Sequence, residues 1–120
     1  MDLNAAMDRL LRLAEESNWT DWAQQFAPGA TVRQNFGGGA RQTVADVVAG
    51  FGAMGLSVRY ENIRRVVRDG IIVEYHDARL SMRGKEAVVD VALIVEFDDD
   101  GKVTSVNEYL DSAALAPLLA

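Results

Sequence analysis

The sequence contains no cysteine and a single histidine among its 120 residues. The absence of cysteine excludes disulfide bonds, thiolate nucleophiles and cysteine-ligated metal sites. Zinc sites usually draw on several His or Cys ligands, so the lone His76 argues against a zinc centre. The longest uninterrupted apolar run, residues 91–95, is far too short to span a bilayer. We therefore expect a protein without a bound metal, a cofactor or a membrane anchor.

Basic residues are also few: the sequence has 12 Lys and Arg against 18 Asp and Glu, which gives a formal net charge of −6. Nucleic acids and anionic membrane surfaces are bound through Lys and Arg patches, so neither is an expected partner. The acidity is typical of a soluble domain. No basic flank precedes an apolar run near the beginning of the sequence, which favours a cytoplasmic protein. The length fits one domain, residues 1–120.

The first half of the chain has mainly helical spacing. Apolar residues recur at three- and four-residue intervals from Leu3 to Ala14, which predicts an amphipathic helix of about four turns. A second, short helix is expected to begin with Thr20 as its cap and to end before Pro28. Residues 30–36 follow as a strand, and Thr43 is the expected cap of a third helix that runs to about residue 54.

From Ser57 onward the apolar period changes to alternation. Four strands are predicted, at residues 57–68, 70–82, 86–98 and 102–110, and the short turns between them favour an antiparallel meander. A sheet with one apolar face needs a cover, and the three N-terminal helices supply it. We therefore predict an α+β fold shaped like a cone: three helices packed on a curved, mainly antiparallel sheet around one pocket. Asp111 or Ser112 is expected to cap a last helical turn.

Three sequence segments resemble the nuclear-transport-factor-two-like (NTF2-like) superfamily. They are Phe26-Ala27-Pro28-Gly29-Ala30 between the second helix and the first strand, the turn Gly101-Lys102-Val103, and the closing Glu108-Tyr109-Leu110-Asp111. This superfamily includes the SnoaL-like polyketide cyclases, ketosteroid isomerases and limonene epoxide hydrolases. The resemblance implies the cone fold and a pocket for a small hydrophobic molecule. It leaves open an isomerase, cyclase, dehydratase or hydrolase, or a non-catalytic binding or dimerisation module.

The strand alternation separates each strand into two faces but does not say which face lines the pocket. Resemblance to the epoxide hydrolases suggests the faces that carry Glu74, His76, Val91 and Glu108. A carboxylate and an imidazole on an apolar wall are the groups that general acid–base catalysis uses near neutral pH. The alternatives are that His76 and Glu108 form a satisfied buried pair, or that the faces are reversed and both are solvated. The candidate catalytic residues are His76, Glu108, Asn35 and Asp77, and the candidate substrate-binding residues are Arg33, Glu74, Trp22, Met54, Val91 and Leu110.

The resemblance to particular enzymes is partial. For limonene epoxide hydrolase it places the water-orienting Asn at Asn35 and the closing-strand Asp at Glu108, but the central Arg falls at His76. Arg33 stands at the position of the Tyr of the hydrolase. The second Asp of the hydrolase corresponds to Ala78, or to Asp77 if the register slips by one residue. Ketosteroid isomerase fits less well, because Gln34 and Asn35 stand where its general base would be, and the first tyrosine in the chain is Tyr60.

The opposite face of the predicted sheet is half apolar. It carries Val73, Tyr75, Ala92, Ile94 and Tyr109 beside charged residues. Such a face is a common dimer surface, and many relatives dimerise through the sheet, so we expect a homodimer. The basic cluster Arg64, Arg65 and Arg68 is interpreted as part of a solvated or interface strand.

Overall fold

The computed structural model describes residues 2–120 and has an α+β fold in which helices lie against one six-stranded sheet. The elements in chain order are α1 (Leu3–Glu15), α2 (Trp19–Ala23), β1 (Phe26–Gln34), β2 (Arg41–Thr43), α3 (Val44–Met54), β3 (Ser57–Arg68), β4 (Ile71–Met82), β5 (Lys85–Phe97), β6 (Val103–Leu110), a 3-10 turn (Ser112–Leu115) and α4 (Ala116–Leu119). No helix within residues 2–120 is long and apolar enough to cross a bilayer.

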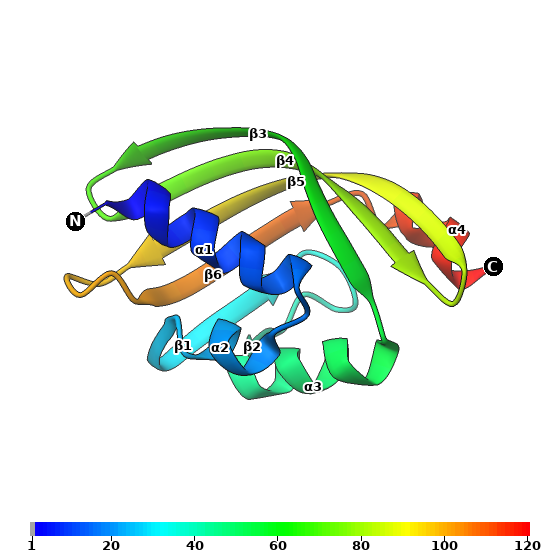
Figure 1. Cartoon of the computed structure of the whole chain (residues 1–120), viewed down its shortest axis with the longest axis horizontal. Helices are drawn as coiled ribbons and strands as arrows, with labels where there is room; N and C mark the ends of the chain where they lie inside the picture. The colour runs from blue at the N-terminus through cyan, green and yellow to red at the C-terminus, as the bar shows by residue number, and fades with distance from the viewer. Residues whose placement is uncertain (1) are drawn as a thin grey trace.

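The sheet has the strand order β2-β1-β6-β5-β4-β3 and is antiparallel except for the parallel pair β1–β6. Its long strands curve over the helices, with α1 lying beneath the arch of β3 and β4, and with α2 and α3 below (Figure 1). The β3–β4 turn carries Asp69 and Gly70 at positive φ, and the β4–β5 turn carries Arg83 and Gly84. Both are two-residue hairpin turns, which match the twist of the strands they join. The predicted cone architecture is confirmed.

The core lies between the helices and the concave face of the sheet. Alternate residues of β4 and β5 are buried, and Ile72 and Val95 are fully inaccessible. Met7, Leu10 and Leu11 of α1 pack into this concave side. The inward set of β4 includes Glu74 and His76, as the resemblance implied. These are the two buried charged or polar residues among residues 2–120, which makes this region of the core the place to seek a function.

The first third of the chain departs from the sequence prediction at α2 and β1. Asn18, rather than Thr20, caps α2, because its side chain accepts a hydrogen bond from the Asp21 N–H at 3.2 Å. Strand β1 begins at Phe26 and runs through Pro28, whereas the strand was expected to begin at residue 30. Its register against β6 shifts between Phe26 and Thr31, and such an irregularity is where a strand tolerates a proline. The short strand β2 was not predicted.

The helix caps further along the chain agree with the sequence. Thr43 caps α3 by accepting from the Asp46 N–H at 3.2 Å, and Gly55 ends it with φ of 63°. Asp111 accepts from the Ala113 N–H at 3.0 Å and begins the closing 3-10 turn. That turn and α4 place Leu115, Leu118 and Leu119 on the wall of the internal cavity.

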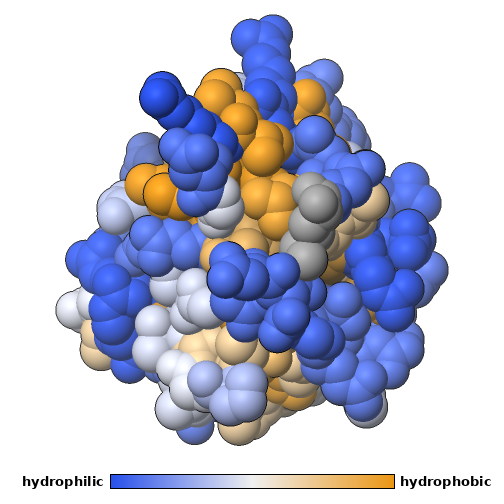
Figure 2. All heavy atoms as spheres, turned by 90° about the vertical axis from the view of Figure 1, so that its left-hand side faces the viewer, coloured by the Kyte–Doolittle hydropathy of each residue, from blue (hydrophilic) through white to orange (hydrophobic). Residues whose placement is uncertain are grey.

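The convex face of the sheet exposes several large apolar side chains. Val66 is 68% exposed, Val73 is 47% exposed, and Tyr75 and Tyr109 are also exposed on this face. Val66 and Val73 are direct neighbours across β3 and β4. At the end of the molecule where the β3–β4 hairpin turns, hydrophobic atoms gather toward the top, around the hairpin (Figure 2). This surface is the one that the sequence assigns to a homodimer.

Candidate functional site

A cavity of about 260 Å³ occupies the concave side of the sheet. Its walls are overwhelmingly apolar and come from the four helices, the closing 3-10 turn and the five strands other than β2. Within residues 2–120, its polar lining apart from the two tryptophans consists of Gln34, Tyr60, His76 and Glu108. No Lys or Arg is among the described residues that line it. An apolar cavity with a few convergent polar groups is the usual form of a small-molecule site, and this volume lies just below the usual range of about 300–1,000 Å³.

Glu108 is the carboxyl group that faces this cavity. It lies on β6, beside Gln34 of β1 and Leu93 of β5. The Gln34 side chain donates a hydrogen bond from Nε2 to Glu108 Oε1 at 2.8 Å. Burial raises the pKa of Glu108 above its ordinary value of 4.5, and this effect exceeds the lowering by the Gln34 hydrogen bond and by the charge of His76. Glu108 therefore holds a proton to a higher pH than an exposed glutamate does.

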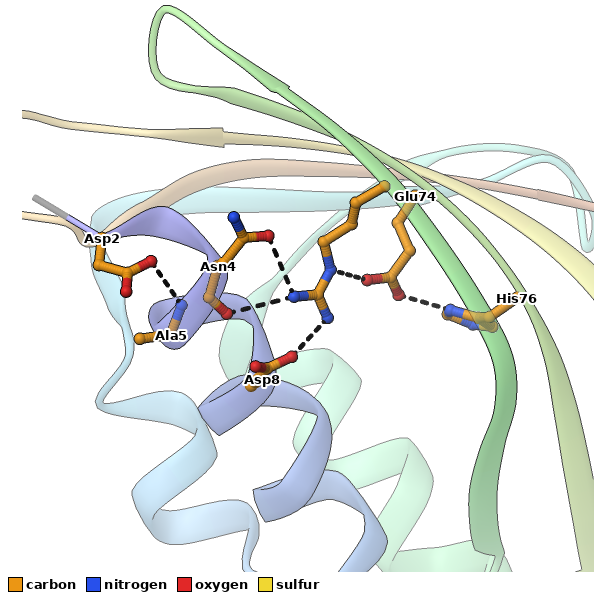
Figure 3. A network of polar contacts seen from close by, with 7 residues as sticks. Asp2, Asn4, Ala5, Asp8, Glu74 and His76 are labelled. Atoms are coloured by element: carbon orange, nitrogen blue, oxygen red, sulfur yellow. Dashed lines mark hydrogen bonds and ion pairs between the residues drawn. The ribbon is translucent and has the colours of Figure 1, made fainter.

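His76 faces the same cavity from β4, on the other side of β5 from Glu108. Its Nδ1 lies 2.5 Å from Oε2 of Glu74, which is fully buried. The other oxygen of that carboxylate, Oε1, accepts a hydrogen bond from Arg65 Nε at 2.7 Å. Arg65 in turn contacts α1, with its Nη2 atom 2.7 Å from Asp8 Oδ1. These contacts form a continuous network from helix α1 to His76 (Figure 3).

Tyr60 completes the polar wall. Its ring packs edge-on against the His76 imidazole, with ring centroids 4.8 Å apart. Burial raises the pKa of the phenol well above its ordinary value of 10, and the nearby carboxylates of Glu108, Glu15 and Glu74 add to the effect. The Tyr60 hydroxyl is therefore a neutral hydrogen-bond donor across the physiological pH range.

Most of the residues selected from the sequence line the cavity. Trp22, Met54, Val91 and Leu110 do so together with His76 and Glu108. Glu74 is not itself a lining residue, because His76 and Arg65 occupy both oxygens of its carboxylate. Its position makes it a partner of the imidazole and not a contact for a ligand.

Arg33, Asn35 and Asp77 lie away from the cavity, so their predicted placement in it is wrong. In β1 the inward positions are 30, 32, 34 and 36, which leaves the odd-numbered side chains on the other face. The Asn35 side chain bridges to the Leu110 backbone, accepting from its N–H and donating to its carbonyl oxygen, each at 3.1 Å. Arg33 donates from Nε to the Gly39 carbonyl at 3.0 Å. These contacts tie the end of β1 to β6 and to the loop after β1.

Asp77 belongs to the convex face. It accepts a hydrogen bond from Asn62 Nδ2 at 2.8 Å, and it stands directly opposite Asp90 on β5. The hydrogen bond from Asn62 lowers the pKa of Asp77, and the hydrogen bond between the two carboxyl groups raises that of Asp90. In the segment 2–120, no group of three or more potential ligands from His, Asp and Glu is arranged to hold a metal ion.

Sequence reasoning did not select Gln34, Tyr60 or Arg65 as site residues. Gln34 could have been found, because Ala30, Val32 and Phe36 share its alternation and mark that face of β1 as apolar. Arg65 was interpreted as part of a solvated or interface strand, yet its side chain is only 10% exposed and contacts Glu74. Its inward direction results from an irregularity in β3 that an alternation pattern does not reveal.

The comparisons with solved structures agree with the fold. A proposed polyketide cyclase from Xanthomonas campestris pv. campestris superposes with a TM-score of 0.82 at 11% identity, over 98% of this chain and 96% of that one. The chain has the NTF2-like fold. A limonene-epoxide-hydrolase-like epoxide hydrolase from Mycobacterium tuberculosis superposes with a TM-score of 0.79 at 15% identity, over 96% of this chain and 87% of that one.

An NTF2-like protein of unknown function from Cytophaga hutchinsonii has a TM-score of 0.75 at 11% identity, with 97% of this chain and 96% of the other covered. No family model and no curated protein matches the sequence. At these identities the neighbours establish the NTF2-like fold, and the function must be argued from the site.

Proposed function

We propose that this NTF2-like protein is an acid–base enzyme that moves a proton on a small, neutral, hydrophobic molecule. The observation that carries the proposal is the pair of titratable groups, His76 and Glu108, facing one apolar cavity from strands on either side of β5. Two titratable groups in different environments are how one site supplies both an acid and a base near neutral pH. The cyclase and epoxide hydrolase among the structural neighbours support an enzyme over a purely structural domain.

The substrate class follows from the charges of the cavity. No Lys or Arg is among its described lining residues to offset a negative charge on a ligand. Burying an unpaired charge in such a site costs far more than burying a neutral group. The cavity therefore favours a neutral molecule with a largely apolar skeleton and one polar function, such as a ketone, over carboxylates and phosphates.

The proposed reaction is proton transfer at a carbon next to a carbonyl group. His76 Nε2 takes the proton from that carbon, and the electron pair of the C–H bond moves to the carbonyl oxygen. Glu108, whose pKa is raised by burial, gives its proton to that oxygen, while the Tyr60 hydroxyl donates a hydrogen bond to it. The product is an enol, with His76 protonated and Glu108 ionised. Where a carbon–carbon double bond is conjugated with the enol, His76 returns its proton to the far carbon of that system while the enol hydroxyl gives its proton back to Glu108, which completes an isomerisation and restores both residues.

Exchange of hydrogen for deuterium tests this proposal before the natural substrate is known. A decalone, a neutral bicyclic ketone, is incubated in D₂O with the protein, and loss of the NMR signals next to the carbonyl is followed. We expect the wild-type protein to accelerate exchange and His76→Gln to lose on the order of 10²-fold or more of that acceleration. Glu96→Gln is the control, because Glu96 is an exposed carboxylate whose contact is Ser105 on β6.

Two results would overturn the proposal. One is exchange that is no faster with the wild-type protein than with buffer, although the decalone binds, which would favour a ligand-binding module on this fold. The other is equal acceleration by the wild-type protein and by His76→Gln, which would place the proton transfer elsewhere.

A further inference from the structure

We propose that Arg65, although it lies outside the cavity, is a positioning residue that acts through Glu74 to keep the proton of the neutral His76 imidazole on Nδ1. The unprotonated Nε2 then faces the bound molecule. The inference rests on the proposed function only for its effect on turnover. The state of the imidazole can be observed whether or not the protein is an enzyme.

An irregularity in β3 decides which arginine reaches Glu74. Glu61 pairs with Asp77 of β4, but the next pair is Arg64 with Tyr75, so β3 contains one extra residue between them. Asn62 lies in this bulge with φ of 55°, a conformation that Asn adopts more readily than most residues. A bulge of this kind redirects the side chains that follow it. As a result Arg65 stands opposite Glu74 on the concave side, whereas Arg64 stands opposite Tyr75 on the convex side.

The donor and acceptor roles of Arg65, Glu74 and His76 allow one placement of the imidazole proton. Arginine only donates hydrogen bonds, and a carboxylate only accepts them. Glu74 Oε1 accepts from Arg65 Nε at 2.7 Å, and Oε2 lies 2.5 Å from His76 Nδ1. Nδ1 must therefore carry the proton. Glu74 is the one hydrogen-bond partner of the imidazole within residues 2–120, so Nε2 is left to the cavity.

Helix α1 holds Arg65, the residue of this contact network that lies farthest from the cavity. Arg65 Nη1 donates to the Asn4 backbone carbonyl at 3.2 Å, and Nη2 is paired with Asp8 at 2.7 Å. The first turn of α1 is itself fixed by Asp2, whose side chain accepts from the Ala5 N–H at 3.0 Å. Figure 3 shows the guanidinium between these helix groups and Glu74. Arg65 is thus oriented from both ends, and the Glu74 carboxylate is held by a permanent cation.

Glu74→Gln tests this arrangement with almost no change of shape. Because Arg65 only donates, the amide oxygen of the glutamine must turn toward it. The amide NH₂ then faces His76 Nδ1 and can only donate to it, so the imidazole proton must move to Nε2. His76 is the single histidine in the chain, so ¹⁵N NMR of histidine-labelled protein reports its two ring nitrogens without ambiguity.

We expect wild-type protein at pH 8.5, above the range in which imidazole ordinarily titrates, to show a protonated Nδ1 and an unprotonated Nε2. Glu74→Gln should reverse the two nitrogens. Arg65→Met should also place a proton on Nε2, because a buried carboxylate without its cation takes up a proton, and Glu74 then donates that proton to Nδ1. Arg64→Met, which changes the neighbouring arginine on the opposite face, should leave the wild-type spectrum unchanged.

The turnover measurement is separate. With any substrate that the wild-type protein converts, Glu74→Gln and Arg65→Met should lower kcat on the order of 10²-fold with little effect on KM, and Arg64→Met should not. An unprotonated Nδ1 in wild-type protein, or a wild-type spectrum in Glu74→Gln, would overturn the inference even if Arg65→Met failed to fold. Absence of any turnover together with the expected spectra would overturn the proposed function and leave the positioning role standing.

Discussion

Replacing Glu108 by Gln should change how the stability of the protein depends on pH. In the wild-type protein Gln34 Nε2 lies 2.8 Å from Glu108 Oε1. The substitution keeps the shape of the side chain and an oxygen that can accept this hydrogen bond, but it removes a group whose pKa is raised by burial. Between the ordinary glutamate value of 4.5 and the raised value, the folded wild-type protein keeps a proton that the unfolded chain releases. The folded state binds more protons there, so wild-type stability falls as the pH rises through this range.

The size of the effect follows from linkage. Each pH unit by which the folded pKa exceeds the unfolded one costs about 1.4 kcal/mol of stability once the pH is above both. For a domain of this length, about 1 kcal/mol corresponds to roughly 4 °C in Tm. The Tm of Glu108→Gln should therefore rise relative to that of wild type between pH 4 and pH 8, by about 5 °C for each pH unit that separates the folded from the unfolded pKa of Glu108.

Thermal unfolding followed by circular dichroism from pH 4 to pH 8 measures this difference. Glu96→Gln serves as the control for removing a carboxylate from the exposed face of β5. The reasoning is refuted if the Tm of Glu108→Gln stays parallel to that of wild type over the whole range, since Glu108 would then titrate alike in the folded and unfolded chains.

Two further substitutions test the sheet. Val73→Glu places a charge in the exposed apolar face beside Val66 and Ile94, so sedimentation should show a shift from dimer to monomer with the fold intact. A monomeric wild-type protein would rule out the dimer, and Gln24→Glu, outside the sheet, is the control. Ile72→Ala removes a fully buried side chain and should cost about 2–5 kcal/mol of unfolding free energy in urea, whereas the exposed neighbour Ile71→Ala should cost much less. Equal losses in the two variants would contradict the assigned faces of β4.

The sheet was predictable because its strands end at residues with special backbone requirements. Ser57–Arg68 agrees with the prediction, and the other three strands begin or end within one residue of it. Turns with Gly70, Gly84 and Gly101 at positive φ set these limits locally. The first strand was harder, since its Phe26 end pairs with Val103 about eighty residues away in a register that no local signal encodes.

The candidate site was predictable in part for the same reason. Alternation along β4 and β6 kept Glu74, His76 and Glu108 on one side, and the fold resemblance said which side. In β1 the odd-numbered residues Arg33 and Asn35 were predicted to face the cavity, whereas Gln34 faces it and was missed. The role of Arg65 depends on the bulge at Asn62, which has a positive φ and donates a hydrogen bond to Asp77, and strand alternation alone does not locate such a bulge.

The central claim is that the cavity accepts a neutral apolar molecule beside Glu108 and His76. Both tryptophans of the chain, Trp19 and Trp22, line the cavity, so their fluorescence reports what enters it. Titration with a decalone at pH 8 should change this fluorescence with saturation, and decalin carboxylate, of similar size but charged, should bind at least about tenfold more weakly, a difference of 1.4 kcal/mol. Equal affinity for the two compounds, or no saturable change with the decalone, would contradict the account.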